Sequence, residues 1–301
     1  MVTETKGLNS VFGAPSAINL RRSTLLQLVI IFAAVASSYA AELDSQALAA
    51  WNDYVASAKL HMQERLIGKS PFLWLDEDPT RRQQLNSGAI VISPVGSSHP
   101  LLVPRGLIHH WIGAIFIPGA TIQDLCGLVG DYGRYAEMYR PTLIKANLLE
   151  SSDNEQRLSI VWMQRVLLVT AAFYTELESK NFALNGRQGY MTFTTTRVQQ
   201  IENYGEKDER RLAQDTGSGY LWRLVSFARF EERDGGLYLE LEVIGLSKDL
   251  PGSLRFLLRP VIDHIPRQAL GTKLDQTRQA IRFRASQRTG TSPLTARERG
   301  N

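Results

Sequence analysis

The hydrophobic positions along this chain change from helical spacing to alternating spacing and then back to helical spacing. Apolar residues recur every three or four positions across residues 42–67, which predicts an amphipathic helix capped by Asp44 or Ser45. Residues 68–87 mix proline with acidic and basic side chains, a composition that predicts a loop with one helical turn. A short strand is expected over residues 89–95.

A β-prone run then leads into two short helices. Residues 107–117 (LIHHWIGAIFI) predict a strand. Thr121 is expected to cap a helix over residues 122–129, and Gly130 to end it. A second short helical segment follows over residues 131–139.

The second half of the chain has the pattern of antiparallel strands joined by tight turns. Turn-forming pairs such as Asp234-Gly235 separate the apolar runs. The expected strands cover residues 142–150, 157–164, 167–177, 188–200, 219–231 and 237–246.

One long amphipathic helix follows the strands. Apolar residues at helical spacing predict it from Pro251 to about Ile281, with Pro260 and Pro266 kinking or dividing it. The residues after Arg284 are rich in Ser, Thr, Gly and Arg and are expected to be disordered. A single sheet with one long helix buries the apolar stripe of that helix against its concave face. The sequence therefore predicts an α+β protein of the helix-grip kind, a curved antiparallel sheet wrapped around a long C-terminal helix.

The N-terminal segment carries the pattern of an export signal. Arg21 and Arg22 precede an apolar run over residues 25–35, and small residues follow it. The run is short for a transmembrane span. We therefore expect residues 1–41 to be a signal peptide that directs the protein to the bacterial periplasm. A membrane anchor over residues 24–41 is the alternative.

Two stretches of the chain resemble the START-like (SRPBCC) helix-grip superfamily, which includes START lipid-transfer domains, pollen-allergen-like proteins and polyketide cyclases. Residues 112–141 (IGAIFIPGATIQDLCGLVGDYGRYAEMYRP) look like the first strand, turn and helix pair of that family, and residues 240–279 look like its last strand and terminal helix. We accordingly expect a START-like domain over residues 101–284, after a helix-and-loop extension over residues 42–100 and before a disordered tail over residues 285–301. The resemblance implies a hydrophobic cavity between sheet and terminal helix, in which known members hold lipids, sterols, polyketides or quinones.

The last predicted hairpin indicates which side chains line that cavity. If either Asp234-Gly235 or Gly235-Gly236 is a two-residue turn, strand parity places alternate residues of both strands on one face, whereas a three-residue loop would invert the faces. The predicted ligand-binding residues are Tyr220, Trp222, Leu224, Ser226, Ala228, Phe230, Leu239, Leu241 and Val243. The small residues Ser226, Ala228 and Gly245 leave two readings open, either close packing of the terminal helix or an open volume for a ligand.

The opposite face of this hairpin is expected to be an outer surface. It carries Arg223, Arg229, Tyr238, Glu240 and Glu242. With the Asp-Gly turn, Arg229 faces Glu240, which predicts an exposed cross-strand ion pair.

The short helices contribute tyrosines and the only cysteine. Tyr132, Tyr135 and Tyr139 fall at helical spacings, and we expect them to pack with their hydroxyls at the surface, the alternative being that they cover the mouth of the cavity. Cys126 excludes an intramolecular disulfide, and its apolar surroundings in sequence predict a buried thiol.

Candidate catalytic residues are few. His109 and His110 are adjacent on a predicted strand and therefore point to opposite faces. The sequence has no HExxH, GxSxG, P-loop or GxGxxG motif, so we expect no metal and no cofactor, and a binding protein rather than an enzyme. The alternative is a polyketide cyclase-like enzyme acting on an aromatic or polyketide ligand. It requires an inward polar pair, for example His109 or His110 with Tyr190 or Arg223.

Composition narrows the choice of partner. The chain has 301 residues, 44% of them hydrophobic and 21% charged, and a formal net charge of +4, which is an ordinary globular balance. No basic patch with interleaved aromatic residues is present, so we expect no nucleic-acid partner. The basic C-terminal end leaves a peripheral contact with anionic membrane as an alternative to a merely solvated tail. The predicted partner is therefore a hydrophobic small molecule.

Overall fold

The computed structural model describes residues 41–166, 169–249, 252–288 and 290. Residues 1–40, which hold nearly all of the predicted signal peptide, lie outside the described residues. No helix of the described part of the chain is long and apolar enough to cross a membrane.

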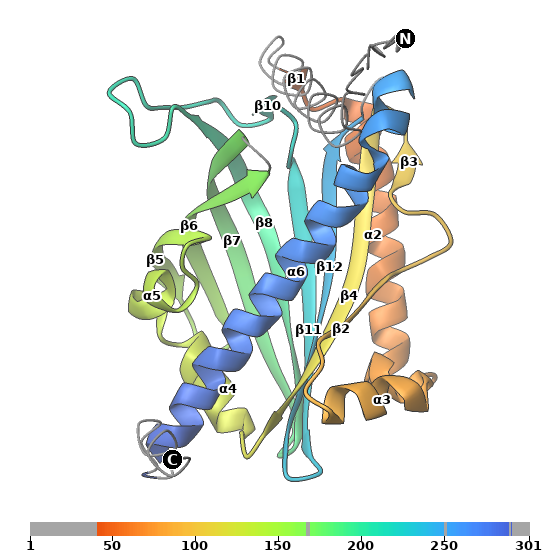
Figure 1. Cartoon of the computed structure of the whole chain (residues 1–301), viewed down its shortest axis with the longest axis vertical. Helices are drawn as coiled ribbons and strands as arrows, with labels where there is room; N and C mark the ends of the chain where they lie inside the picture. The colour runs from red at the N-terminus through yellow and green to blue at the C-terminus, as the bar shows by residue number, and fades with distance from the viewer. Residues whose placement is uncertain (1–40, 167–168, 250–251, 289, 291–301) are drawn as a thin grey trace, which may run out of the picture.

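A curved antiparallel sheet forms the body of the fold, and one long helix crosses its concave face (Figure 1). The strand order is β2-β4-β12-β11-β8-β7-β6-β5, with β3 also paired to β4 and β9 to β8. These strands are β2 (Val91–Pro94), β3 (Leu101–Val103), β4 (Gly106–Pro118), β5 (Leu143–Ser151), β6 (Glu155–Val166), β7 (Val169–Asn185), β8 (Gln188–Glu202), β9 (Arg210–Arg211), β11 (Arg223–Arg233) and β12 (Gly236–Lys248). Two short strands, β1 (Ala41–Glu42) and β10 (Thr216–Gly217), pair separately. The arrangement confirms the predicted α+β helix-grip fold.

The helices lie on two sides of this sheet. Helix α6 (Gly252–Arg288) lies on the concave side, together with α4 (Ile122–Val129), the 3-10 helix η2 (Tyr132–Arg134) and α5 (Tyr135–Met138). The N-terminal extension supplies α2 (Ser45–Leu66), the 3-10 helix η1 (Trp74–Glu77) and α3 (Pro79–Asn86). Residues 68–87, predicted as a loop with one turn, therefore form two helical segments. Asp78 starts the second of them by accepting a hydrogen bond from the backbone N–H of Thr80, and Pro79 occupies its first turn.

The hairpin of β11 and β12 has the predicted two-residue turn. Arg233 pairs with Gly236, so Asp234 and Gly235 alone form the loop, and both have positive φ angles of 54° and 74°. This is the backbone that Asp-Gly favours in a hairpin. Phe230 consequently pairs with Leu239, and the alternation of faces expected from the sequence is confirmed.

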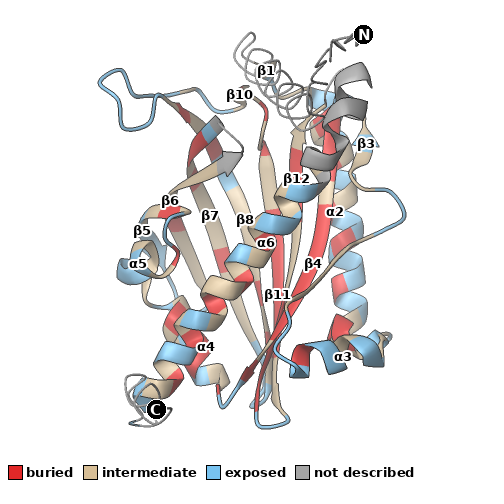
Figure 2. Cartoon of the chain, viewed as in Figure 1, coloured by how far each residue is buried: buried red, intermediate tan, exposed pale blue. Residues whose placement is uncertain are grey.

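The convex face of this hairpin is not the outer surface that the sequence predicted. Arg229, Tyr238 and Glu240 are fully buried, and Figure 2 shows the buried residues concentrated on β4, β11 and β12. Helix α2 and the segment with η1 cover these strands, and Trp51 and Val55 of α2 pack in one apolar cluster with residues of the convex face. The alternation of residues along a strand separates the two faces of a sheet, but it does not predict which other segment of the chain covers each face.

The covering helix is held to the sheet by a buried polar network. His110 of β4 makes hydrogen bonds of 2.9 Å to the hydroxyl of Tyr54 on α2 and of 2.8 Å to Glu242. Arg229 donates to Glu242 at 2.9 Å and to Glu240 at 3.3 Å. Glu240 also accepts from the backbone N–H groups of Trp74 and Leu75 in η1, at 2.9 and 2.7 Å. Two helical segments of the extension are thus tied to β4, β11 and β12 on the side opposite to α6.

Helix α6 differs from the prediction in two respects, at its prolines and at its C-terminal end. It is continuous from Gly252 to Arg288, so Pro260 and Pro266 do not divide it. Its last turns belong to the fold, because Ala285 is buried and Arg288 donates to the carboxylate of Asp124 on α4 at 3.0 Å. Residues 285–288 are therefore helical rather than part of a disordered tail. Residues 289 and 291–301 of that predicted tail lie outside the described residues.

Helix α4 begins and ends at the predicted residues but presents its cysteine differently. Thr121 forms a capping box with Asp124, and Gly130 ends the helix. Leu125 and Leu128 are buried, whereas Cys126 is exposed, which corrects the expectation of a buried thiol. In so short a helix every residue is close to an apolar neighbour in sequence, so the local composition did not identify the buried face.

Candidate ligand cavity

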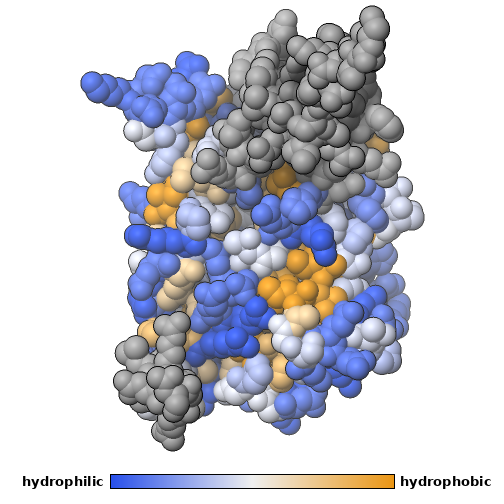
Figure 3. All heavy atoms as spheres, in the orientation of Figure 1, coloured by the Kyte–Doolittle hydropathy of each residue, from blue (hydrophilic) through white to orange (hydrophobic). Residues whose placement is uncertain are grey.

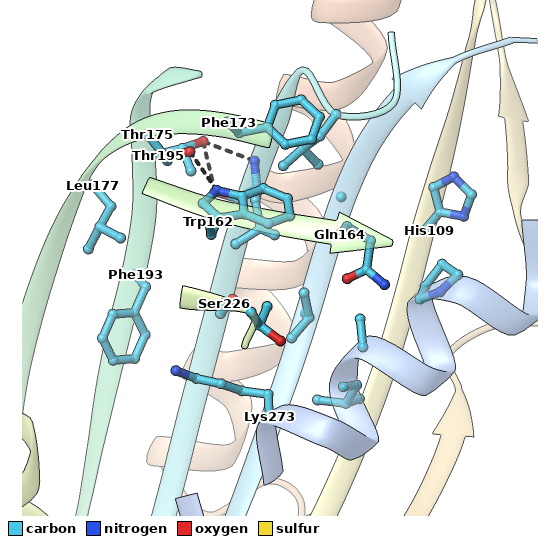
Figure 4. Close-up of a pocket in the computed structure, with 18 of the residues that line it drawn as sticks. His109, Trp162, Gln164, Phe173, Thr175, Leu177, Phe193, Thr195, Ser226 and Lys273 are labelled. Carbon is cyan, nitrogen blue, oxygen red and sulfur yellow. Dashed lines mark hydrogen bonds between the residues drawn. The ribbon is translucent and has the colours of Figure 1, made fainter. Parts of the chain in front are cut away.

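A cavity of about 1100 Å³ lies between the concave face of the sheet and α6 (Figure 4). Its walls come from β4, β6, β7, β8, β11 and β12, from α6, and from α4 and α5 at one end. Most of the lining side chains are apolar. This volume is at or above the upper end of the range of about 300–1,000 Å³ that is usual for small-molecule pockets.

The predicted ligand-binding residues are gathered on this cavity with one exception. Those that line it are Tyr220, Trp222, Leu224, Ser226, Ala228, Leu239, Leu241 and Val243. Phe230 shares their face of the sheet but does not line the cavity, because it lies near the hairpin turn, where it packs into the core with Ile117 and Leu237. The prediction for Phe230 is therefore corrected to a core position.

The small residues in the middle of the hairpin border open space. A Cβ atom placed on Gly245 would meet only Cδ1 of Leu221, at the ordinary contact distance of 3.7 Å. The close approach of α6 to the sheet occurs elsewhere, at Gly113 of β4, where a Cβ atom would lie 2.6 Å from Cδ1 of Leu274. The helix thus packs tightly on β4 and stands away from β11, which leaves the cavity between.

An aromatic wall closes the far side of the cavity. Trp162 of β6 stacks on Phe173 of β7 with ring centroids 4.7 Å apart, and its indole N–H donates to the hydroxyl of Thr175 at 2.9 Å (Figure 4). Met191 and Phe193 of β8 also line the cavity. The sequence did not orient these strands, because their register could not be read from the chain. The structure shows that β7 and β8 also shift register, between Glu176 and Leu177 and between Ala183 and Asn185.

Lys273 of α6 is a cavity residue that the sequence analysis did not identify. Its Nζ lies 3.3 Å from the centroid of the Tyr139 ring. Burial lowers the pKa of Lys273 to about 7, and the residue lines the cavity. The available signal was the position of this lysine, at helical spacing from the apolar residue Leu270 and next to Leu274, on the side of the helix that the sequence predicts to be buried.

Two of the three tyrosines of the short helices turn their hydroxyls inward. Tyr135 donates to the backbone carbonyl of Val129 at 2.6 Å, and the hydroxyl of Tyr139 lies 3.3 Å from that of Thr277 on α6. Both rings line the cavity and meet edge to face at 5.7 Å. Burial raises the pKa of both phenols, so they stay neutral. The expectation that their hydroxyls reach the surface is therefore wrong for Tyr135 and Tyr139.

The two histidines point to opposite faces of β4, as predicted. His109 lines the cavity, where its Nε2 lies 2.9 Å from the hydroxyl of Ser247 and burial lowers its pKa to about 4. It is therefore a neutral imidazole at ordinary pH. His110 belongs to the buried network on the convex side.

The polar pairs proposed for a cyclase-like site are not formed. Tyr190 lies on the convex side of β8, opposite Arg229, and stacks on Phe182 at 4.6 Å. Arg223 is on the convex side too and binds Asp215 at 2.5 Å. Neither residue therefore reaches His109 in the cavity. No group of three or more His, Cys, Asp or Glu side chains in the described residues has the geometry to hold a metal ion.

The structure thus defines a helix-grip protein with a large apolar cavity. No family model and no curated protein matches the sequence. Solved structures similar to it include the ZhuI aromatase/cyclase from Streptomyces sp. R1128, with 10% identity, coverage of 59% of this chain and 95% of that chain, and a TM-score of 0.41. A STAR-related lipid transfer protein from Xanthomonas axonopodis has 13% identity, coverage of 64% and 98%, and a TM-score of 0.37. Human STARD10 has 7% identity, coverage of 71% and 87%, and a TM-score of 0.38. At these values the likeness concerns the fold alone.

Proposed function

We propose that this chain is an exported binding protein that holds a hydrophobic small molecule, such as a lipid or a quinone, between its sheet and α6. The observation that carries the proposal is the cavity of about 1100 Å³ with predominantly apolar walls. Transfer of apolar surface from water into such a space contributes about 25 cal/mol per Å². A binding role requires only this apolar volume and no acid or base in a fixed position.

The distribution of charge around the cavity supports entry of the ligand at one end. Glu42, Asp44, Arg105 and Lys248 line the end near β1 and the start of β4. Arg105 is mostly exposed and pairs with Asp44 at 3.3 Å. The coloured part of the face seen in Figure 3 is mostly hydrophilic, with an apolar patch near its middle.

Export is supported by the sequence of residues 1–41, with its two arginines, apolar run and small residues. Fractionation of cells that produce the protein, with the mature N-terminus read by mass spectrometry, tests this part. A cleaved chain in the periplasmic fraction is the expected result. An uncleaved chain in the membrane fraction would favour the anchor over residues 24–41.

Native mass spectrometry of the purified protein, followed by organic extraction, tests the binding role. We expect a reproducible apolar species bound to the wild-type chain. Ala228→Phe, which enlarges a side chain on the cavity wall, should reduce occupancy several-fold. Ala183→Phe, at an exposed position of β7, is the matched control and should retain the ligand. An unbound mass for the wild type, also after incubation with envelope lipids and quinones, would contradict the proposal.

A polyketide cyclase-like enzyme in the same cavity is the second candidate, and the observation that favours it is the contact between His109 and Ser247. A neutral imidazole with a hydroxyl partner inside an apolar pocket is able to accept a proton from a bound ligand. Conversion of an extracted or added aromatic ligand, followed by mass spectrometry, tests this role. Turnover by the wild type and not by His109→Ala would support the enzyme, and an unchanged ligand mass would leave the binding role.

A further inference from the structure

Lys273 places a titratable amine in a part of the cavity whose other lining side chains are apolar or uncharged polar groups. Figure 4 shows its side chain extending from α6 into the space bordered by Phe193 and Ser226. The cavity-lining residues of β6, β7, β8, β11 and the middle of β12 include no carboxylate. The charged residues Glu42, Asp44, Arg105, Lys248 and Asp249 line only the end of the cavity near β1.

Among the described residues, the amine of Lys273 contacts an aromatic ring but has no hydrogen-bond acceptor or carboxylate as a partner. The Tyr139 ring lies under Nζ at 3.3 Å, an arrangement that favours an ammonium ion. None of the hydrogen bonds or ion pairs among the described residues uses Nζ as a donor. Thr277, one turn further along α6, donates its hydroxyl to the backbone carbonyl of Lys273 and not to its amine. A buried ammonium with one aromatic contact and no anion is costly unless a ligand supplies the anion.

We propose that Lys273 binds the carboxylate of an amphipathic ligand, so that the cavity selects long-chain carboxylic acids over the corresponding alcohols and esters. The inference rests on the proposed binding function and names the class of ligand. One ammonium balances one carboxylate, whereas a phosphate monoester carries more charge and more acceptor oxygens than this single donor group satisfies. The apolar chain of the acid would lie along the walls formed by Leu239, Leu241 and the aromatic pair of Trp162 and Phe173.

The proposal has a distinctive pH signature. Because the pKa of Lys273 in the ligand-free protein is about 7, carboxylate binding above that pH must take up a proton to form the ammonium. Affinity for the acid should therefore fall by up to about tenfold per pH unit above about pH 7, and affinity for the alcohol should not. The other titratable groups that face this part of the cavity stay neutral across this range, His109 because its pKa is about 4, and Tyr135 and Tyr139 because burial raises theirs.

Isothermal titration calorimetry with lauric acid and lauryl alcohol tests the proposal. At about pH 6 we expect wild-type protein to bind the acid at least about tenfold more tightly than the alcohol. Lys273→Met, which keeps the length of the side chain, should remove this preference and leave alcohol binding intact. Lys145→Met, at an exposed position of β5 outside the cavity, is the matched control and should behave as wild type.

The outcomes separate this inference from the function on which it rests. Equal affinity of wild-type protein for acid and alcohol, unaffected by Lys273→Met, would overturn the role of Lys273 and leave the binding function standing. Failure of both compounds to bind the wild type would count against the binding function itself. If Lys273→Met does not fold, titration of the wild type at about pH 8 in two buffers of different ionisation enthalpy decides the question. Proton uptake on binding of the acid supports the proposal, and its absence overturns it.

Discussion

Arg229 and Glu240 face each other across β11 and β12, with Nε and Oε2 3.3 Å apart, and both side chains are completely buried. The pairing is the one that the Asp-Gly turn predicted, but its surroundings are not. Glu240 also accepts two backbone N–H groups of η1, so the N-terminal extension completes the hydrogen bonding of a charge on the sheet. Helix α2 and η1 of the extension are thus part of the folded core, on the side of the sheet opposite the cavity.

Removal of Arg229 should destabilise the protein strongly. In Arg229→Met, Glu240 stays buried without its cation, and breaking a buried pair in this way costs about 3–5 kcal/mol. The free energy of unfolding from urea denaturation measures the effect. Arg210→Met, which removes a pair between the exposed Arg210 and Glu202, is the control and should cost at most about 1 kcal/mol. A loss for Arg229→Met as small as that of the control would show that the buried pair does not hold the extension.

Glu242 should make the free energy of unfolding depend on pH in the acidic range. Burial by itself raises the pKa of this carboxylate, but the hydrogen bonds from His110 and Arg229 outweigh burial and lower it to about 2. Since the folded pKa lies below the ordinary value of 4.5, this group stabilises the fold above that pH, and the contribution is lost as the pH falls toward about 2.

Comparison with Glu242→Gln isolates this effect from other carboxylates. At neutral pH the variant should be less stable than wild type by about 3 kcal/mol, and the difference should shrink between about pH 4.5 and pH 2. Urea denaturation at several pH values measures it. Glu206→Gln, in the exposed loop after β8, should show no such convergence. A difference in stability between wild type and Glu242→Gln that stays constant with pH would contradict the lowered pKa of Glu242.

Two glycines on the concave face should respond differently to the same substitution. Gly113→Ala places a methyl group 2.6 Å from Leu274 and should cost about 1–3 kcal/mol, because α6 or its side chains must move. Gly245→Ala places a methyl group in the cavity, where its nearest neighbour is 3.7 Å away, and should be neutral or stabilising by about 0.5 kcal/mol. Thermal unfolding of both variants checks this, and equal losses would mean that α6 packs on β12 as closely as on β4.

Lys273 should lower the free energy of unfolding of the ligand-free protein at neutral pH. Its folded pKa of about 7 lies below the ordinary value of 10.5, so above pH 7 the unfolded chain binds one more proton than the folded chain. The stability of the delipidated wild type should therefore rise by up to about 1.4 kcal/mol per pH unit above about pH 7. Lys273→Met should be the more stable protein at about pH 7, and its advantage should shrink toward about pH 9. An advantage independent of pH would show that the lysine is not desolvated.

Much of the order of helices and strands, and the hairpin face that lines the cavity, followed from the sequence. The Asp234-Gly235 turn determined the register of the last hairpin, and the register assigned alternate residues to one face. Eight of the nine predicted ligand-binding residues line the cavity, and six of them lie within the two strands of this hairpin. The cap at Thr121 and the stop at Gly130 likewise act within one helical turn, so local sequence was sufficient to place α4.

What only the tertiary structure decided involves contacts between segments that are far apart in the chain. Met62 and Trp74 meet Arg229 and Glu240 more than a hundred residues away, so no local pattern revealed that the convex face is covered. The inward tyrosine hydroxyls and the lysine beneath them depend on how α6 crosses α5, which helical spacing does not specify. Periodicity reports which residues share a face, whereas burial depends on which partner that face meets.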